Sequence, residues 1–468
     1  MEERIERDSM GEMKVPEAAY YGAQTARARD NFPISGLRLP RELILALGAI
    51  KEAAARVNSE LGLLEAGLAQ AIIQAAGEVA EGKFDSEFVI DIFQTGSGTS
   101  SNMNTNEVVA SRANEILTGQ KGGKSPVHPN DHVNLGQSSN DTFPSAIQVA
   151  AALSCHQNLS PALERLANEL EQKAGDWDDV VKIGRTHLMD ATPVRLGQEA
   201  SGWAGQAALA AERIGSALAR VYALPQGGTA VGTGINTHPE FGRRVAEQLA
   251  QRFGIPFRET ENHFEAQHSR DCLAELAGVL AAVASGIFKI ANDIRWLSSG
   301  PRCGLGEIIL PAVQPGSSIM PGKVNPVLCE ALMMVSVQVM GNSQTVLIAN
   351  THGNLDLNVM MPVMAKNLLE SILWLANAIN VFVAKALIGA EANRERAGSF
   401  VEQSLAMVTA LVPVIGYDRA AAISKEAMHE NKTVRQLLLE QKILPEAEIQ
   451  RILDPTSMTE PGLGAGGE

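Results

Sequence analysis

LAELAGVLAAVASGIFKIANDIRWL, residues 273–297, decides the fold class of this chain. Its leucines, isoleucines and one central valine recur every three or four residues, the spacing that places side chains on one face of an α-helix. The apolar seam lasts for more than three heptads, a length typical of helices that pack in a long bundle. We therefore expect the seam to be buried; its members are Leu273, Leu276, Leu280, Val283, Ile287, Ile290, Ile294 and Leu297.

Helical patterns of the same kind cover most of the chain, and the alternation typical of strands is scarce. They run over residues 41–81, 142–175, 196–224 and 327–350, whereas a polar stretch at 94–106 indicates a loop. We expect a mainly α protein with three parts. They are an N-terminal domain (1–141), a long central helical bundle (142–395) and a small helical C-terminal domain (396–468).

The composition narrows the classes of function. The 468 residues are 45% hydrophobic and carry a formal net charge of −14. An acidic chain is not expected to bind nucleic acid or an anionic membrane surface. No uninterrupted apolar run reaches the length of about 18–20 residues that a membrane span needs, and no signal peptide is visible. We expect a soluble, cytoplasmic protein with no membrane or nucleic-acid partner.

The cysteines also argue against a metal or disulfide framework. They are scattered, and no CxxC pair or histidine partner stands at the spacing of metal ligands. Buried, reduced thiols are the expectation for Cys155, Cys272, Cys303 and Cys329.

Four polar stretches interrupt the apolar pattern, at residues 95–107, 127–141, 184–190 and 314–326. In the first, the segment Ser97-Gly98-Thr99 offers hydroxyl and amide donors to an anion. In the second, Ser138, Ser139 and Asn140 precede a helical run, where either a helix cap or an anion site is expected. Three successive donors exceed what a cap needs, which favours ligand contact.

The fourth stretch, QPGSSIMPGKVNP, is a loop because glycine and proline break helices. Asn325 and Pro326 fit the N-cap and first residue of the next helix, whose positive end would then lie beside Lys323. Glu330 either stabilises this helix end by its charge or pairs with His187 of the third stretch as a proton relay. A lone histidine such as His187 is more often structural than catalytic. Walker, GxGxxG, HExxH and GxSxG motifs are absent, so acid–base chemistry on a small anion is the expectation.

GSSIMPGKVNP, residues 316–326, resembles the signature loop of the fumarase/aspartase superfamily, whose members add or eliminate across the double bond of fumarate. SGTSSNMNTNE, VHPNDHVN, QSSNDTFP and KIGRTHLMDATP are similar to the class II fumarate hydratases (fumarase C type), in the same order over about residues 4–456. His187 after GRT separates the chain from aspartases, which typically carry glutamine there.

The resemblance implies reversible hydration of fumarate to (S)-malate without metal or cofactor, in a homotetramer where three subunits build each active site. It implies that Ser317 removes the methylene proton of malate and that His187, coupled to Glu330, handles the water. Ser318 and His187 remain alternatives for the base. The implied substrate contacts are Ser97, Gly98, Thr99, Ser138, Ser139, Asn140, Thr186, Ser318, Lys323, Val324 and Asn325.

HPND, which comprises His128, Pro129, Asn130 and Asp131, matches a second, non-catalytic dicarboxylate site of the family; the alternative is a turn that caps the next helix. Some fumarases have a basic residue just before it, where this chain has Ser125 and Pro126. Two other functions compete with fumarate hydration: aspartate ammonia-lyase, and an inactive scaffold of the same fold. The full set of catalytic residue types argues against the scaffold.

Overall fold

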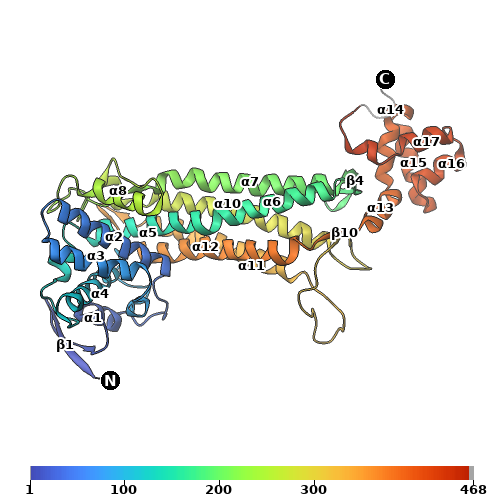
Figure 1. Cartoon of the computed structure of the whole chain (residues 1–468). Coiled ribbons are helices and arrows are strands. Elements are labelled where there is room, and N and C mark those ends of the chain that lie inside the picture. Colours follow the sequence, from blue (N-terminus) through green and yellow to red (C-terminus); the bar gives the residue numbers. More distant parts are fainter. Residues whose placement is uncertain (1, 463–468) are drawn as a thin grey trace. The chain divides into compact units, whose positions relative to one another are not determined.

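The computed structural model describes residues 2–462, which are mainly helical with short two-stranded sheets (Figure 1). The chain forms two compact units. Unit 1 comprises Met1–Pro161, Glu212–Ser285 and Ser336–Ala376, and unit 2 comprises Ala162–Ala211, Gly286–Val335 and Asn377–Glu468. The expected three-domain division stays a prediction; its limits at residues 141 and 395 fall inside α5 and α13.

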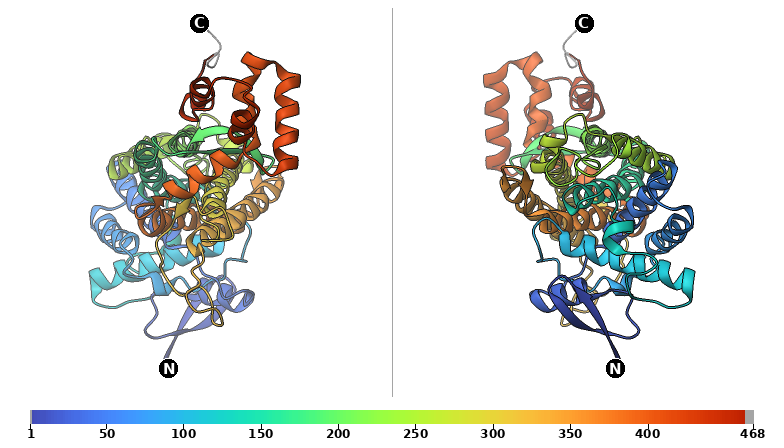
Figure 2. Two further views of the ribbon diagram at one scale, coloured as in Figure 1. Left: turned by 90° about the vertical axis from the view of Figure 1, so that its right-hand side faces the viewer. Right: turned by 90° about the vertical axis from the view of Figure 1, so that its left-hand side faces the viewer.

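Most of the helices of unit 1 lie in its first segment, where α2, α3 and α4 are side by side (Figures 1 and 2). The pattern expected as one helix over residues 41–81 is two helices. Gly62 adopts a positive φ of 72° after α2, and Glu65 caps α3. The elements here are β1 (Glu3–Asp8), β2 (Gly11–Pro16), α1 (Ala23–Asn31), α2 (Arg41–Glu60), α3 (Ala66–Ala80), α4 (Thr99–Thr118) and α5 (Ser139–Ser154).

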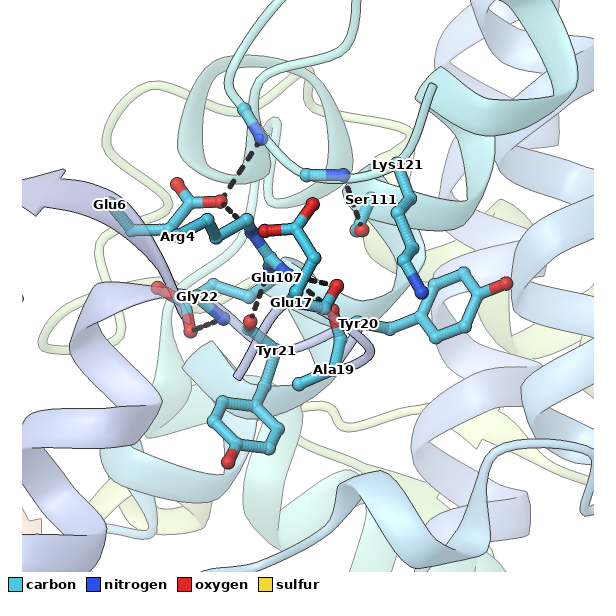
Figure 3. A network of polar contacts seen from close by, with 12 residues as sticks. Arg4, Glu6, Glu17, Ala19, Tyr20, Tyr21, Gly22, Glu107, Ser111 and Lys121 are labelled. Atoms are coloured by element: carbon cyan, nitrogen blue, oxygen red, sulfur yellow. Dashed lines mark hydrogen bonds and ion pairs between the residues drawn. The ribbon is translucent and has the colours of Figure 1, made fainter. Parts of the chain in front are cut away.

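The N-terminal hairpin β1–β2 is fastened to this helical layer by Arg4 (Figure 3). Its guanidinium donates to Glu6 Oε1 at 2.9 Å and to four backbone carbonyls of residues 16–21. The carboxylate of Glu107, on α4, accepts from Gly22 N at 2.9 Å and from two further amides at the start of α1. The bonds of Glu107 therefore join α4, whose first residue is Thr99, to the start of α1.

The seam that predicted the bundle lies on α10 (Asp271–Leu297), and the prediction of burial is confirmed. All eight seam residues are at most 7% exposed. Five long helices each contribute segments to both units: α6 (Ser160–Asp176), α7 (Leu196–Val221), α10, α11 (Val327–Asn350) and α12 (Met361–Phe382). The remaining helices and strands of unit 1 are β5 (Ala223–Leu224), α8 (Phe241–Phe253), β6 (Arg258–Glu259), α9 (His263–His268), β8 (Gly353–Asn354) and β9 (Leu357–Asn358).

The expectation of a loop at residues 94–106 is confirmed for 94–98 and wrong from Thr99, where α4 begins. Two polar residues of this first part of α4 are buried: Asn102 and Asn106 are 0% exposed. Their amides donate to the side chains of Ser139 and Asn134, a pairing that hydropathy does not reveal.

Unit 2 ends in a cluster of short helices with its own apolar core. Ile183, from the hairpin of β3 (Val181–Thr186) and β4 (Met189–Arg195), is buried in that core beside residues such as Val401 and Leu411. The other elements are β7 (Ile308–Ile309), β10 (Glu391–Ala392), α13 (Arg394–Gln403), α14 (Val412–Ile415), α15 (Tyr417–Glu430), α16 (Val434–Gln441) and α17 (Glu446–Ile452).

Three helical stretches are long and apolar enough to cross a membrane by length and composition, so the expectation that none would be is wrong. They are Asp271–Leu297, Val327–Asn350 and Met361–Leu387, the last including the π-turn after α12. Counting uninterrupted apolar runs missed them, because isolated polar residues such as Lys289 lower the mean hydropathy only slightly. In α10 the apolar residues form the buried seam, which accounts for that helix without a lipid phase.

Candidate functional site

The predicted site residues fall into two groups, one in each unit. In unit 1, Ser97, Gly98 and Thr99 lead into α4. Gly98 has a φ of 73°, and a Cβ there would lie 2.3 Å from Phe143 Cγ, so only glycine fits. Ser97 Oγ and Thr99 Oγ1 lie 2.8 Å apart, and Gly98 offers no side-chain cap to the helix start. Two hydroxyls and the first amides of a long helix thus gather at one point, where an anion is stabilised.

The hydrogen bonds at the start of α5 show whether Ser138 acts as a helix cap. Its hydroxyl accepts from Asn140 N at 3.2 Å, and Asp141 accepts from Ser138 N at 2.9 Å, forming a capping box. Ser138 is therefore the cap. Ser139 Oγ accepts from Asn102, and Asn140 Nδ2 donates to the carbonyl of Ala230. Ligand contact by the three residues stays a prediction.

A network of side-chain hydrogen bonds joins the start of α4 to the start of α5, and the sequence reasoning missed it. Asn134 Oδ1 accepts from three donors: Lys51 Nζ at 3.0 Å, and Asn102 Nδ2 and Asn106 Nδ2, each at 3.2 Å. Asn102 Nδ2 also donates to Ser139 Oγ at 3.1 Å. A signal was present, because Lys51 interrupts the apolar face of its helix four residues after Leu47.

The HPND stretch forms a π-turn, Pro129–Val133, and the alternative reading as a cap is confirmed. His128 Nδ1 accepts from Asn130 N at 3.2 Å and Asp131 N at 3.1 Å. Because Nδ1 accepts these two bonds, the proton of a neutral ring would be on Nε2, which remains able to donate to a ligand. Nothing in these contacts tests the second dicarboxylate site.

In unit 2, His187 stands at the exposed tip of the β3–β4 hairpin. His187 and Leu188 have φ values of 58° and 63°, and Thr186 pairs with Met189 across the turn. Two successive residues with positive φ make the turn that matches the twist of a two-stranded hairpin, a conformation that side chains other than glycine adopt at some cost. The fold therefore presents the imidazole at the tip of a tight turn.

A buried ion-pair cluster holds this hairpin. Arg185, two residues before His187, places Nη1 at 2.9 Å from Glu307 Oε2 and Nη2 at 3.1 Å from Oε1. Lys182 Nζ lies 3.5 Å from the same carboxylate and 3.0 Å from Glu199. Glu307 is 0% exposed, so its charge depends on these two cations.

We expect Glu307→Gln to destabilise the protein by about 3–5 kcal/mol, because the partly buried Arg185 would face a neutral amide and the buried Lys182 would keep Glu199 as a partner but lose Glu307. Chemical unfolding followed by circular dichroism measures the loss. The matched control is Glu402→Gln, which removes a partly exposed pair with Arg435 and should cost less than about 1 kcal/mol. Equal losses in the two variants would contradict the role given to the cluster.

The signature loop closes on itself through Gly316. Gly316 N donates to the Lys323 carbonyl at 2.7 Å, and Asn325 Nδ2 donates to the Gly316 carbonyl at 2.7 Å. A Cβ on Gly316 would lie 2.6 Å from the Lys323 oxygen, so a side chain would force this neck open. Within the loop, Ser317 Oγ accepts from Ile319 N at 3.2 Å and Met320 N at 3.0 Å.

The start of α11 differs from the expected one by one residue. The helix begins at Val327, and the Pro326 carbonyl accepts from Glu330 N, so Pro326 takes the capping position expected for Asn325. The amide of Asn325 instead ties the neck of the loop. Ser318, Lys323, Val324 and Glu330 are exposed.

His187 and Glu330 are not joined in the described part of the single chain, where neither side chain has a hydrogen bond or ion pair to the other. Their pairing as a relay stays a prediction. Among residues 2–462, no group of three histidine, cysteine, aspartate or glutamate side chains is arranged to hold a metal ion.

Comparison with known proteins assigns the chain to a family. The family described as Lyase matches residues 11–341, and the one described as Fumarase C C-terminus matches residues 407–460. The class II fumarate hydratase of Methylorubrum extorquens is 52% identical to this chain, and the match covers 98% of each protein. The class II fumarate hydratase of Thermus thermophilus is also 52% identical, over 99% of this chain and 100% of its own length. The crystal structure of class II fumarase from Schistosoma mansoni superposes with a TM-score of 0.95, at 41% identity, covering 98% of this chain and 99% of that one.

Proposed function

The chain belongs to the class II fumarate hydratase family of lyases, and we propose that it catalyses the reversible hydration of fumarate to (S)-malate. The observation that carries the proposal is the geometry of Ser317. Its oxygen accepts two backbone N–H groups inside a loop whose neck only glycine permits. Hydrogen bonds to an oxygen favour its ionised form, so these amides support a serine that acts as a base.

The other assignments follow the resemblance and are supported by position. Lys323 lies in the same loop as Ser317, and a cation there would stabilise the doubly negative aci-carboxylate formed when the methylene carbon loses its proton. Thr186 and His187 are adjacent at the hairpin tip, where the imidazole would give a proton to the departing hydroxyl. In the hydration direction the same groups act in reverse.

We also propose that the active protein is a homotetramer in which three subunits build each site. Two facts support this. The first is that the assigned residues of a site are divided between the two units. The residues around Thr99 and Ser139 share one hydrogen-bond network in unit 1, whereas His187 and Ser317 lie in unit 2. Large apolar side chains of α7 and α11 are also uncovered in the single chain, which is typical of an interface: Leu209 is 49%, Met334 67%, Val337 54% and Ile348 63% exposed.

Two further assignments belong to this proposal. The HPND turn would bind a second dicarboxylate, with His128 Nε2 as a donor. Here Ser125 precedes Pro126, and the basic residue Lys124 is one position further back. The location would be the cytoplasm, in keeping with four cysteines that are free thiols in the structure. Their expected burial is confirmed for Cys155 and Cys329 and wrong for Cys303, which is exposed.

The test follows the ultraviolet absorbance of fumarate with purified protein, beside samples that contain ammonia or a chelator. We expect the absorbance to fall without ammonia and in the presence of the chelator, with (S)-malate as the product. Loss only with ammonia would assign the chain to the aspartate ammonia-lyases. No loss in any sample would favour the inactive scaffold.

A further inference from the structure

The ammonium of Lys51 is completely buried but has no counter-ion in contact. Its side chain is 0% exposed, and Nζ donates to Asn134 Oδ1 at 3.0 Å and Gln137 Oε1 at 2.9 Å, both uncharged amides. In the described part of the chain no carboxylate forms an ion pair with it. Burial lowers the pKa of Lys51 to about 7, although the charge of Asp141 opposes this effect.

Within the described residues, no neighbouring element brings a carboxylate into ion-pair contact with Lys51, and the charge of Asp141 acts on it without such a contact. Among the elements packed against α2, only Asp141 of α5 acts on Lys51, and burial raises the pKa of Asp141 to about 6. Other charges on these elements have partners of their own: Arg112 of α4 pairs with Glu78 of α3 and Glu115, Arg252 of α8 with Glu52, Arg244 of α8 with Glu240, and Asp131 with His128, while Glu107 of α4 accepts from three amides at the start of α1.

The chemistry of Lys51 decides which groups donate and which accept in the hydrogen-bond network around it. An ammonium only donates, so Asn134 must present its oxygen to Lys51, and Asn102 and Asn106 must present their NH₂ groups to that oxygen. Asn102 Nδ2 then also reaches Ser139 Oγ at 3.1 Å. Asn102 Oδ1 is buried without a partner in the described structure. Lys51 is therefore separated from Ser139 by two amide side chains.

We propose that Lys51 is a positioning residue that supplies a buried positive charge beneath Ser139 and strengthens the binding of the dicarboxylate there. The proposal rests on the proposed function, which places substrate at Ser139. A buried ammonium without a counter-ion costs folding free energy, and a bound dianion is the charge that would compensate it. The side-chain amides of Asn134 and Asn102 would in addition hold the Ser139 hydroxyl oxygen as an acceptor, so that the hydroxyl proton of Ser139 is free to be donated to the substrate.

The proposal makes substrate affinity depend on pH with a definite sign. A dianion binds better to the protonated lysine, so its binding raises the pKa of Lys51 and takes up a fraction of a proton near pH 7. As the pH rises through about 7, the free protein loses this charge and the KM for fumarate rises. Stability changes in the opposite sense. The folded pKa lies below the unfolded value, so the folding cost is complete below about pH 7 and falls as the pH rises.

Lys51→Met tests the charge with a side chain of similar length. At about pH 6 we expect KM for fumarate to rise about tenfold, and the rise of KM with pH seen in the wild type to be lost. We expect the melting temperature at that pH to be equal to or higher than that of the wild type. Calorimetry in buffers of different ionisation enthalpy should show proton uptake on fumarate binding by the wild type and none by the variant.

Lys173→Met is the matched control. Lys173 is also buried, at 6% exposed, but its Nζ donates to the carbonyls of Ile388 and Ala390 in unit 2. This variant should lose stability and keep both KM and its pH dependence. An unchanged KM profile in Lys51→Met, with an active wild type, would overturn the inference. An inactive wild type would instead overturn the proposed function.

Discussion

Ser317→Ala is expected to lower kcat by about 10³–10⁴-fold with a much smaller change in KM, because it removes the proposed base and leaves the substrate contacts in place. The variant loses the two bonds that the Ser317 hydroxyl accepts from Ile319 N and Met320 N, but the neck of the loop should stay closed. The neck depends on Gly316, Lys323 and Asn325, and none of those bonds involves the serine hydroxyl. Steady-state hydration of fumarate and circular dichroism measure the two effects.

Ser318→Ala is the matched control for this result. Ser318 is the neighbouring serine and an alternative base, but no hydrogen bond to its hydroxyl is present in the described structure. If Ser317 is the base, Ser318→Ala should lower kcat less than about tenfold. The reverse order of the two losses would move the base to Ser318, and near-normal turnover in Ser317→Ala would contradict the assignment.

His187→Gln is expected to lower kcat by about 10²–10⁴-fold, since an amide cannot exchange the proton that the imidazole would. His187 is exposed at a hairpin tip, so the melting temperature should change little. Glutamine is the residue typical of aspartases at this position, and we expect no ammonia-dependent loss of fumarate to appear. Its appearance would show that this single position separates the two reactions.

The coupling of His187 to Glu330 can be measured in the same series. If the two form one relay, Glu330→Gln should cause part of the same loss, and the double variant should lose less than the sum of the two single free-energy changes. Additive losses would contradict the relay.

The fold was predictable from the sequence where one physical rule dominates. The period of the seam from Leu273 to Leu297 predicted both a helix and its burial, because an apolar stripe at that spacing has no other stable position. The rule failed where polar side chains are buried in a helix. Asn102 and Asn106 suggest a loop by composition, but both lie in α4, and their side-chain amides donate to Asn134, far away in the sequence.

In the candidate site, too, local patterns were predictable and side-chain pairings were not. The signature loop was predictable from its glycines and prolines, and the Ser138 cap was one of two readings that the sequence left open. The side chains that support each motif were not predictable. Arg185 of the GRTH motif depends on Glu307, which lies outside that motif, and the hydrogen-bond network that reaches Ser139 depends on Lys51. Pairings between side chains distant in sequence follow from the folded path of the chain, and no local pattern contains them.

If three subunits build each site, as proposed above, we expect His187 and Ser317 of one fumarate site to come from different copies of the chain. Co-expression of Ser317→Ala and His187→Gln chains under two purification tags, with isolation of the mixed oligomers, tests it most directly. Each parent should be nearly inactive, whereas random mixing should restore about a quarter of the sites if the two residues of a site come from different subunits. Mixed oligomers that hydrate fumarate no faster than their parents would contradict the claim.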